Sequence, residues 1–322
     1  MPRVNWLAAL GTFVGALAVY PLAISGLERI GLREGARSNL PRSHVHKIGT
    51  PTAGGTLFVV AVLVAWAIVA RDPAGGLVAG AAALGCGAGL IDDITKVRRH
   101  EGVRFRPKLL LLALCAGLLA VGVFATSATT QTVPGLGPRD LGVFGLALAG
   151  FAILATANAA NLTDGVDGLA AGCGIPGLGA CAALAMVEHR AQLAVTCACL
   201  AAALLAFLVY NRPRASVFMG DAGSLAVGLA LAVAAIEVGA LVLLPLLALI
   251  YLIEAGSVII QLTHVRLTGG RRLFRASPIH HHFEEGGMSE WAIAVRFWTG
   301  AALAAALAAY WAVSAGLPGG AR

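Results

Sequence analysis

The amino-acid sequence predicts an all-α integral membrane protein that crosses the bilayer about ten times. Of its 322 residues, 58% are hydrophobic and 12% are charged, whereas a soluble domain carries roughly 25% charged residues. The mean hydropathy is +0.84. A chain of this composition has too little polar surface to coat a soluble globule. The composition therefore excludes a secreted enzyme, a nucleic-acid-binding domain and a disordered scaffold.

Ten apolar runs are long enough to cross a bilayer, at about 20 residues for each helical span. The expected spans cover roughly residues 5–26, 53–70, 75–91, 108–125, 141–158, 170–187, 193–210, 222–236, 239–262 and 292–314. We expect residues 1–322 to form a single transmembrane domain, because no internal repeat or low-complexity linker separates these runs.

Basic residues are concentrated in the loops that follow odd-numbered spans. Those loops hold 17 Lys and Arg residues, against 3 in the loops after even-numbered spans and 2 at the chain ends. Positively charged loops stay in the cytoplasm, so we expect both termini outside. Acidic residues contribute little to orientation, yet five of them fall on the same side, which favours a shared cytoplasmic site: Asp92, Asp93, Asp164, Asp167 and Asp221.

Two glycine-rich or acidic motifs lie in the third span and just after it. Gly85-Cys86-Gly87-Ala88-Gly89 follows no strand and completes no G-x-G-x-x-G, so it favours tight helix packing over nucleotide binding. Asp92 and Asp93 follow at the end of the span, with Lys96 one turn further on and Lys108 beyond. A solvated helix end is one interpretation. The other is a Mg²⁺ site, since this ion accepts one or two carboxylates and leaves its other positions to phosphates and water.

Three further motifs carry chemistry. Asn158 to Gly168 is dense in short polar side chains, which suits either a turn that caps two helices or the recognition of a polar ligand. Asp221 stands at a helix start, where it can act as a cap. His280, His281 and His282 are consecutive, and helical side chains point about 100° apart, so they cannot share one metal. A phosphate- or sugar-binding loop is favoured over a pH-tuned surface loop.

Taken in order, these motifs resemble the polyprenyl-phosphate N-acetylhexosamine-1-phosphate transferases, most closely the phospho-N-acetylmuramoyl-pentapeptide transferase branch. The Asp92-Asp93 pair and the N-L-T-D-G-V-D-G segment ending at Gly168 are superfamily features, and P-I-H-H-H-F-E at Pro278 is particular to the muramoyl branch. The resemblance implies transfer of phospho-MurNAc-pentapeptide from its UDP carrier to undecaprenyl phosphate, giving lipid I and UMP. It also implies Mg²⁺ as cofactor, a multi-pass location in the bacterial inner membrane, and a homodimer.

The resemblance also implies a role for each matching residue. Asp221 is expected to bind Mg²⁺, with Asp92 and Asp93 positioning or deprotonating the acceptor phosphate and supporting the metal. His280 and His281 are expected to assist phosphate binding. The expected uridine, pyrophosphate and other substrate contacts are Lys47, Thr52, Lys96, Lys108, Asn158, Asn161, Asp164, Asp167, Asn211, Phe218, Glu254 and His282.

Two other functions remain open at this point. A sister transferase would move GlcNAc-1-phosphate; the histidine triplet argues against it, whereas the Glu285–Glu290 loop, which departs from the muramoyl pattern, leaves it open. A transporter would place charged residues inside its spans near the midplane. Glu254 is nearly the only such residue here, because the other acids lie toward one membrane face.

The charge asymmetry predicts the outcome of reporter fusions. Fusions in the loops at Arg37, Arg98 and Arg271 should report a cytoplasmic location, and fusions after Arg71 and Arg139 an external one, because of the 17 basic residues on one side. A cytoplasmic signal from a fusion after Arg71 or Arg139 would contradict the number of spans.

Overall fold

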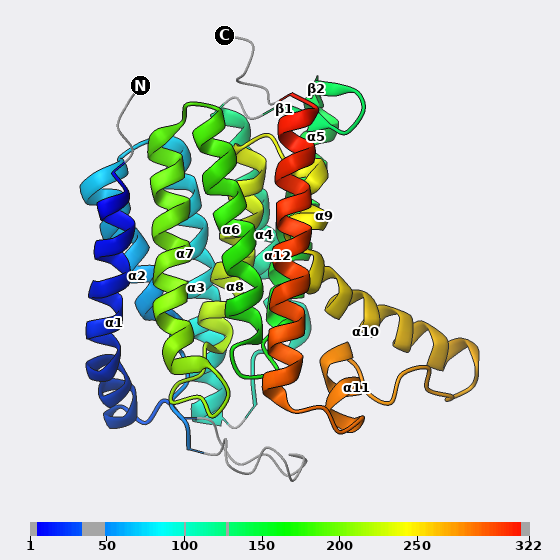
Figure 1. Ribbon diagram of the computed structural model, residues 1–322. Helices are drawn as coiled ribbons and strands as arrows, with labels where there is room; N and C mark the ends of the chain where they lie inside the picture. Colours follow the sequence, from blue (N-terminus) through cyan, green and yellow to red (C-terminus); the bar gives the residue numbers. More distant parts are fainter. Residues whose placement is uncertain (1–4, 34–48, 100, 127–128, 317–322) are drawn as a thin grey trace.

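The computed structural model describes residues 5–33, 49–99, 101–126 and 129–316, and it is a bundle of helices that run side by side (Figure 1). The long helices are α1 (Trp6–Arg29), α3 (Pro73–Arg99), α4 (Phe105–Ala125), α5 (Gly142–Thr163), α6 (Leu169–Val187), α7 (Ala191–Asn211), α8 (Gly220–Glu237), α10 (Leu249–Leu267) and α12 (Glu290–Ser314). The shorter elements are α2 (Gly55–Ala65), α9 (Leu244–Leu247), α11 (Ile279–Glu285), and strands β1 (Thr130–Val133) and β2 (Gly137–Asp140).

The expected all-α membrane architecture is confirmed, with nine helices in the described part of the chain that are long and apolar enough to cross a membrane. Each expected span except the ninth coincides with one continuous helix. The second, expected at 53–70, is shorter than the others: α2 has 11 residues and passes into a π-helical segment, Trp66–Ala70. The antiparallel β1–β2 hairpin was not predicted.

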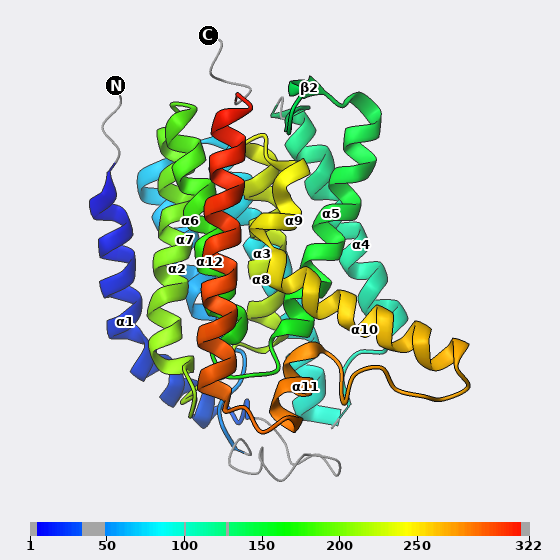
Figure 2. The ribbon, with the colours of Figure 1, turned by 45° about the vertical axis from the view of Figure 1, so that its right-hand side comes forward.

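The expected ninth span, residues 239–262, is wrong as a single helix. A 3-10 turn (Leu241–Leu243) and α9 come first, and the helix is interrupted at Ala248, whose φ and ψ are −116° and 26°. From there α10 leans out of the bundle (Figure 2). Packing accounts for the break, because the backbone at Leu247 lies directly against α6. A Cβ added to Gly177 of α6 would lie only 2.6 Å from the Leu247 carbonyl oxygen. Hydropathy measures how apolar a run is and contains no information about its direction.

Helix α8 forms the centre of the bundle, and every residue from Asp221 to Glu237 is buried. Its neighbours approach closely through glycine. A Cβ on Gly85 of α3 would lie 2.7 Å from the Ala226 backbone, and one on Gly89 would overlap the Asp221 carbonyl. Such contacts are the main source of helix association in a bilayer, where apolar burial gives little driving force between helices. The packing interpretation of Gly85 and Gly89 is confirmed; Gly87 has no neighbour within 4 Å.

A polar network fixes the end of α8 that lies far from Asp221. The buried Glu237 carboxylate pairs with Arg190 at 2.8 Å and accepts a hydrogen bond from Thr126 at 2.6 Å. The β1 strand joins this end, because the Thr132 N–H donates to the Gly239 carbonyl at 2.7 Å. The Thr132 hydroxyl also donates to the Gly316 carbonyl at 3.2 Å. The last turn of α12 and the first turn of α1 therefore lie at one end of the bundle, and the start of α8 lies at the other (Figure 1).

The contact between α3 and α8 predicts different effects for two neighbouring glycines. Gly89→Ala should lower the thermal stability of the purified protein, since overpacking of this kind costs about 1–3 kcal/mol. Gly87→Ala is the matched control on the same helix and should leave the melting temperature unchanged or higher, because its Cβ would meet open space. Equal melting temperatures for the two variants would contradict the close packing of α3 on α8.

Candidate active site

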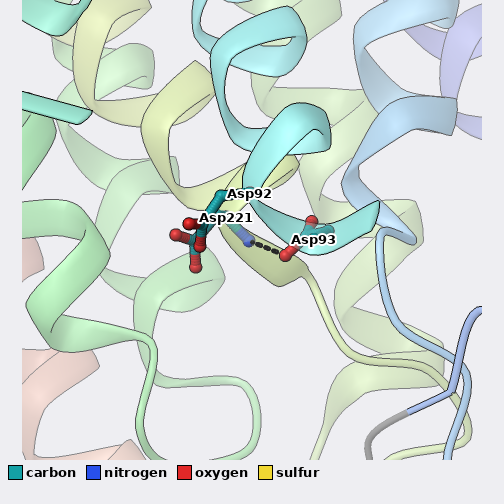
Figure 3. Close-up of side chains that lie close together, drawn as sticks. All are labelled: Asp92, Asp93 and Asp221. Atoms are coloured by element: carbon teal, nitrogen blue, oxygen red, sulfur yellow. Dashed lines mark hydrogen bonds between the residues drawn. The ribbon is translucent and has the colours of Figure 1, made fainter. Parts of the chain in front are cut away.

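Three aspartates from two helices form a buried cluster. Asp92 and Asp93 lie near the end of α3, and Asp221 lies in the first turn of α8; they are 2%, 3% and 8% exposed. Each contributes a carboxylate oxygen such that the three oxygens lie within 4.8 Å of one another (Figure 3). The solvated-helix-end interpretation of Asp92 and Asp93 is therefore wrong, because the helix continues to Arg99 and both side chains are buried.

The start of α8 is held by Asp93. Its two carboxylate oxygens accept hydrogen bonds from the backbone N–H groups of Asp221 and Ala222, each at 3.0 Å. The first of these is the dashed line in Figure 3. Gly220, at φ 70°, makes room for this contact, because a Cβ there would overlap the Asp93 side chain. The residue at the cap position, Met219, makes no side-chain cap. The interpretation of Asp221 as the cap is therefore wrong: Asp93 caps the helix from α3.

Asp221 instead faces two lysines. Lys96 of α3 approaches one of its oxygens at 2.8 Å, and Lys108 of α4 contacts the other. Lys96 also pairs with Asp92 at 2.6 Å, one helical turn away, and Lys108 lies 3.6 Å from the same Asp92 oxygen. The second Asp92 oxygen accepts the Val103 N–H at 2.7 Å. Two ammonium groups thus lie against the carboxyl groups of Asp92 and Asp221, beside Asp93.

Helix α5 extends this cluster through Asn161. The side-chain oxygen of Asn161 lies 3.4 Å from the Lys108 ammonium, and its side-chain NH₂ donates to the Ser224 hydroxyl at 2.9 Å. Ser224 donates in turn to the Gly220 carbonyl at 3.1 Å. Asn158 lies one turn earlier and donates to the Leu154 carbonyl of its own helix at 2.9 Å. Ser224 was not among the expected site residues, although its spacing of three residues from Asp221 indicates the same side of a helix.

The loop between α5 and α6 is tied to the loop between α7 and α8. The buried Asn211 accepts the Gly168 N–H at 3.0 Å and donates to the Val217 carbonyl at 2.9 Å. The buried Asp167 accepts the Ala215 N–H at 3.0 Å. These two residues, both expected at the donor site, hold its backbone in place. Asp164 is partly buried at the end of α5.

The segment before α2 also reaches the start of α8. The Phe218 N–H donates to the Pro51 carbonyl at 2.8 Å, and its carbonyl accepts the Gly54 N–H at 2.9 Å. The buried Thr52 donates its N–H to the Leu32 carbonyl at 3.0 Å. Thr52 and Phe218 therefore lie together beside Gly220, as expected of two parts of one site. Lys47, expected in the same site, lies outside the described residues.

The histidine segment is a short helix, α11, rather than a loop. His280 is fully buried, and its Nδ1 lies 3.1 Å from Glu254 Oε2 of α10. His281 is partly exposed and pairs with Glu284 at 2.6 Å. His282 accepts the Arg275 N–H at 3.1 Å. The three imidazoles therefore have three different partners.

Two side chains outside the expected site residues, Gln261 and Trp298, hold the backbone in this region. The buried Gln261 of α10 accepts the N–H groups of Leu273 and Phe274 at 3.1 and 2.9 Å, and so holds the chain that leads to α11. Trp298 of α12 donates to the Gly168 carbonyl at 3.1 Å. Gln261 was detectable, because a polar residue within an apolar span is rarely without a role.

The aspartate cluster fits a hard divalent cation. Its donors are carboxylate oxygens, which suit Mg²⁺, Ca²⁺ or Mn²⁺ better than a softer ion. The three carboxylates differ in what they face: both oxygens of Asp221 and one of Asp92 face lysine side chains, which can turn away, whereas both oxygens of Asp93 accept backbone N–H groups of α8. A cation held here would be coordinated mainly by Asp221 and Asp92.

Comparison with known proteins places this site in a family. Residues 76–239, which contain the aspartate cluster, match the family model described as glycosyl transferase family 4. A protein of Desulforamulus reducens is 41% identical over 92% of both chains, and one of Rubrobacter xylanophilus is 44% identical over 81% of this chain and 83% of its own. A third, of Halalkalibacterium halodurans, is 37% identical over 96% and 98%. All three are named phospho-N-acetylmuramoyl-pentapeptide-transferase, and the chain belongs to that family.

Proposed function

We propose that this chain transfers phospho-N-acetylmuramoyl-pentapeptide from UDP-MurNAc-pentapeptide to undecaprenyl phosphate, which forms lipid I and UMP for peptidoglycan synthesis. The observation that carries the proposal is the buried Asp92, Asp93 and Asp221 cluster with two lysines at one end of an apolar helix bundle. The names of its relatives support the choice of substrates.

The proposed location is the bacterial inner membrane, with the aspartate cluster on the cytoplasmic side and both termini outside. The described basic residues support this orientation, since most lie in loops or adjoining helix turns at the end of the bundle that holds the cluster. A nucleotide donor then arrives from the cytosol, and a lipid phosphate reaches the same level from the inner leaflet.

In the proposed reaction, an oxygen of the acceptor phosphate bonds to the β-phosphorus of the donor. The bond from that phosphorus to the bridging oxygen breaks, and UMP leaves with the bridging oxygen and its electron pair. A phosphate monoester has a second pKa of about 6, so the acceptor is mostly a dianion at neutral pH. Alignment and neutralisation of charge therefore contribute more than proton removal, as is general for phosphoryl transfer.

Each member of the cluster has a separate proposed role. Asp221 holds Mg²⁺, with Asp92 in support; when bound, Mg²⁺ supplies positive charge to the pyrophosphate and to the leaving UMP. Asp93 keeps Asp221 in place through the α8 backbone. Lys96 and Lys108 neutralise the aspartates in this structure and turn to phosphate oxygens when substrates bind.

The donor is proposed to lie over the ends of α5 and α7 and beside α11. His281 is the histidine proposed to meet a phosphate, because it is partly exposed and its ring lies against that of the buried His280. The remaining donor contacts stay as proposals on the residues expected from sequence: Lys47, Thr52, Asn158, Asn161, Asp164, Asp167, Asn211, Phe218 and His282.

The metal proposal predicts that activity requires a divalent cation and that Mg²⁺ supports it better than Zn²⁺. Asp221→Asn should lower turnover at least about 100-fold, since a metal supplies several kcal/mol of transition-state stabilisation and about 1.4 kcal/mol is a factor of ten. The assay measures UMP release by purified protein at saturating Mg²⁺. Asp140→Asn, an exposed change at the opposite end, is the control and should retain full turnover. Near wild-type turnover of Asp221→Asn would remove the metal role.

The donor proposal predicts selectivity between two sugar nucleotides. UDP-MurNAc-pentapeptide should be used and UDP-GlcNAc essentially not, because the long segment between α10 and α12 offers a lactyl-peptide a surface that a bare GlcNAc donor does not need. UMP release from each donor, with a short polyprenyl phosphate as acceptor, measures the ratio. A comparable or higher rate with UDP-GlcNAc would assign the chain to the sister transferases.

A further inference from the structure

Glu254 and His280 form a fully buried pair at the point where α11 contacts α10. The side chain of Glu254 is 0% exposed and that of His280 is 1% exposed. Oε2 of Glu254 lies 3.1 Å from His280 Nδ1 and accepts the His280 backbone N–H at 3.4 Å. Within the described residues, Glu254 Oε1 and both ring nitrogens of His280 have no hydrogen-bond partner, so that Nδ1 meets Glu254 only at ion-pair distance. Neither side chain has surface with which to touch a substrate.

Burial makes each member of this pair depend on the other. An ionisable group removed from water is costly unless an opposite charge or a hydrogen bond compensates it. Glu254 has His280 as its partner, and the start of α11 has no side-chain cap of its own, because Pro278 stands at the cap position. The pair therefore determines where α11 sits on α10.

The Nε2 edge of the His280 ring packs against the loop between α5 and α6. A Cβ on Gly165 would overlap Nε2 of His280, so the imidazole occupies the space that a side chain at 165 would take. Gly165 directly follows Asp164, one of the proposed donor contacts. The buried pair thus connects three elements: α10, α11 and the α5–α6 loop.

The neighbouring His281 depends on the same packing. The two imidazole rings have centroids 4.2 Å apart, and His281 lies at the partly exposed side of α11 with Glu284. Because consecutive side chains of a helix point about 100° apart, burial of His280 fixes the direction of His281.

We propose that Glu254 and His280 are positioning residues: together they hold α11 against the α5–α6 loop, and so place His281 and Asp164 for the sugar-nucleotide donor. Neither residue contacts the donor. This inference rests on the proposed transferase function, and it assigns to Glu254 and His280 an indirect role in place of the direct contacts expected from sequence.

The test uses steady-state kinetics of the full chain, with donor and acceptor varied separately. Glu254→Gln and Gly165→Ala should raise the KM for UDP-MurNAc-pentapeptide at least about fivefold, which is the low end of typical coupling between sites. The KM for polyprenyl phosphate and the Mg²⁺ concentration for half-maximal rate should not change. Glu237→Gln is the matched control: it breaks another buried ion pair, at the far end of the bundle, and should lower stability without a change in donor KM.

A double variant separates positioning from independent effects. If both residues act through one contact, Glu254→Gln combined with His280→Gln should raise the donor KM no more than the larger single effect, because changes within one interaction are not additive. Additive effects in the double variant would overturn the proposal, and so would a donor KM raised equally by the Glu237→Gln control.

Hydrogen exchange tests the contact without any turnover. Backbone amides of Ile279–Glu285 should exchange faster in Glu254→Gln and in Gly165→Ala than in the wild type, with α8 unchanged. Unaltered exchange in both variants would overturn the proposal even if the enzyme is active. Absence of wild-type turnover with UDP-MurNAc-pentapeptide would instead contradict the proposed function, and the exchange data would still decide on the contact. Gly165→Ala retains both members of the pair, so it serves if Glu254→Gln does not fold.

Discussion

The two hydrogen bonds from the start of α8 to Asp93 are the interaction on which the rest of the site depends. A helix begins with N–H groups that have no partner within the helix, and in an apolar bundle each unsatisfied group is costly. Asp93 satisfies two of them from α3. Gly89 allows α3 to approach closely enough for this contact. Asp221, which would otherwise be the natural cap, is thereby free to face Lys96 and Lys108.

Glu254 repeats this arrangement on α11, where a carboxylate from a neighbouring helix accepts a backbone N–H near the helix start. In both places one acid fixes a helix, and another group on that helix faces the proposed site: Asp221 on α8 and His281 on α11. Exposure separates the histidines in the same way, since His280 is fully buried and His281 is about one-third exposed. The residue type of a polar side chain beside a site therefore does not show that it contacts substrate. Its role depends on which atoms its oxygens or nitrogens face.

Sequence alone predicted all but one of the membrane spans, the close packing of Gly85 and Gly89, and the meeting of Asp92, Asp93 and Asp221. Each follows from local composition or from the side of the membrane on which a residue falls. The break at Ala248 was not predictable, since it depends on how Leu247 packs against Gly177 of α6. The cap by Asp93 was also missed, because its partners lie 128 and 129 positions away in the chain. The histidine segment was expected as a loop. Its helix was missed because contacts with α10 and α12 hold it, and these are not visible in the local sequence.

The two parts of the site are carried by different parts of the bundle. The aspartates and lysines stand on α3, α4 and the central α8, which is buried along its length and fixed at its far end by Glu237 and Arg190. The histidines stand on α11, which follows a helix that leans out of the bundle (Figure 2). Helix α5 and its following loop connect the two, through Asn161 on one side and Gly165 on the other. Because α8 is buried along its length, we expect any difference in donor recognition to involve α10, α11 and the segment between them.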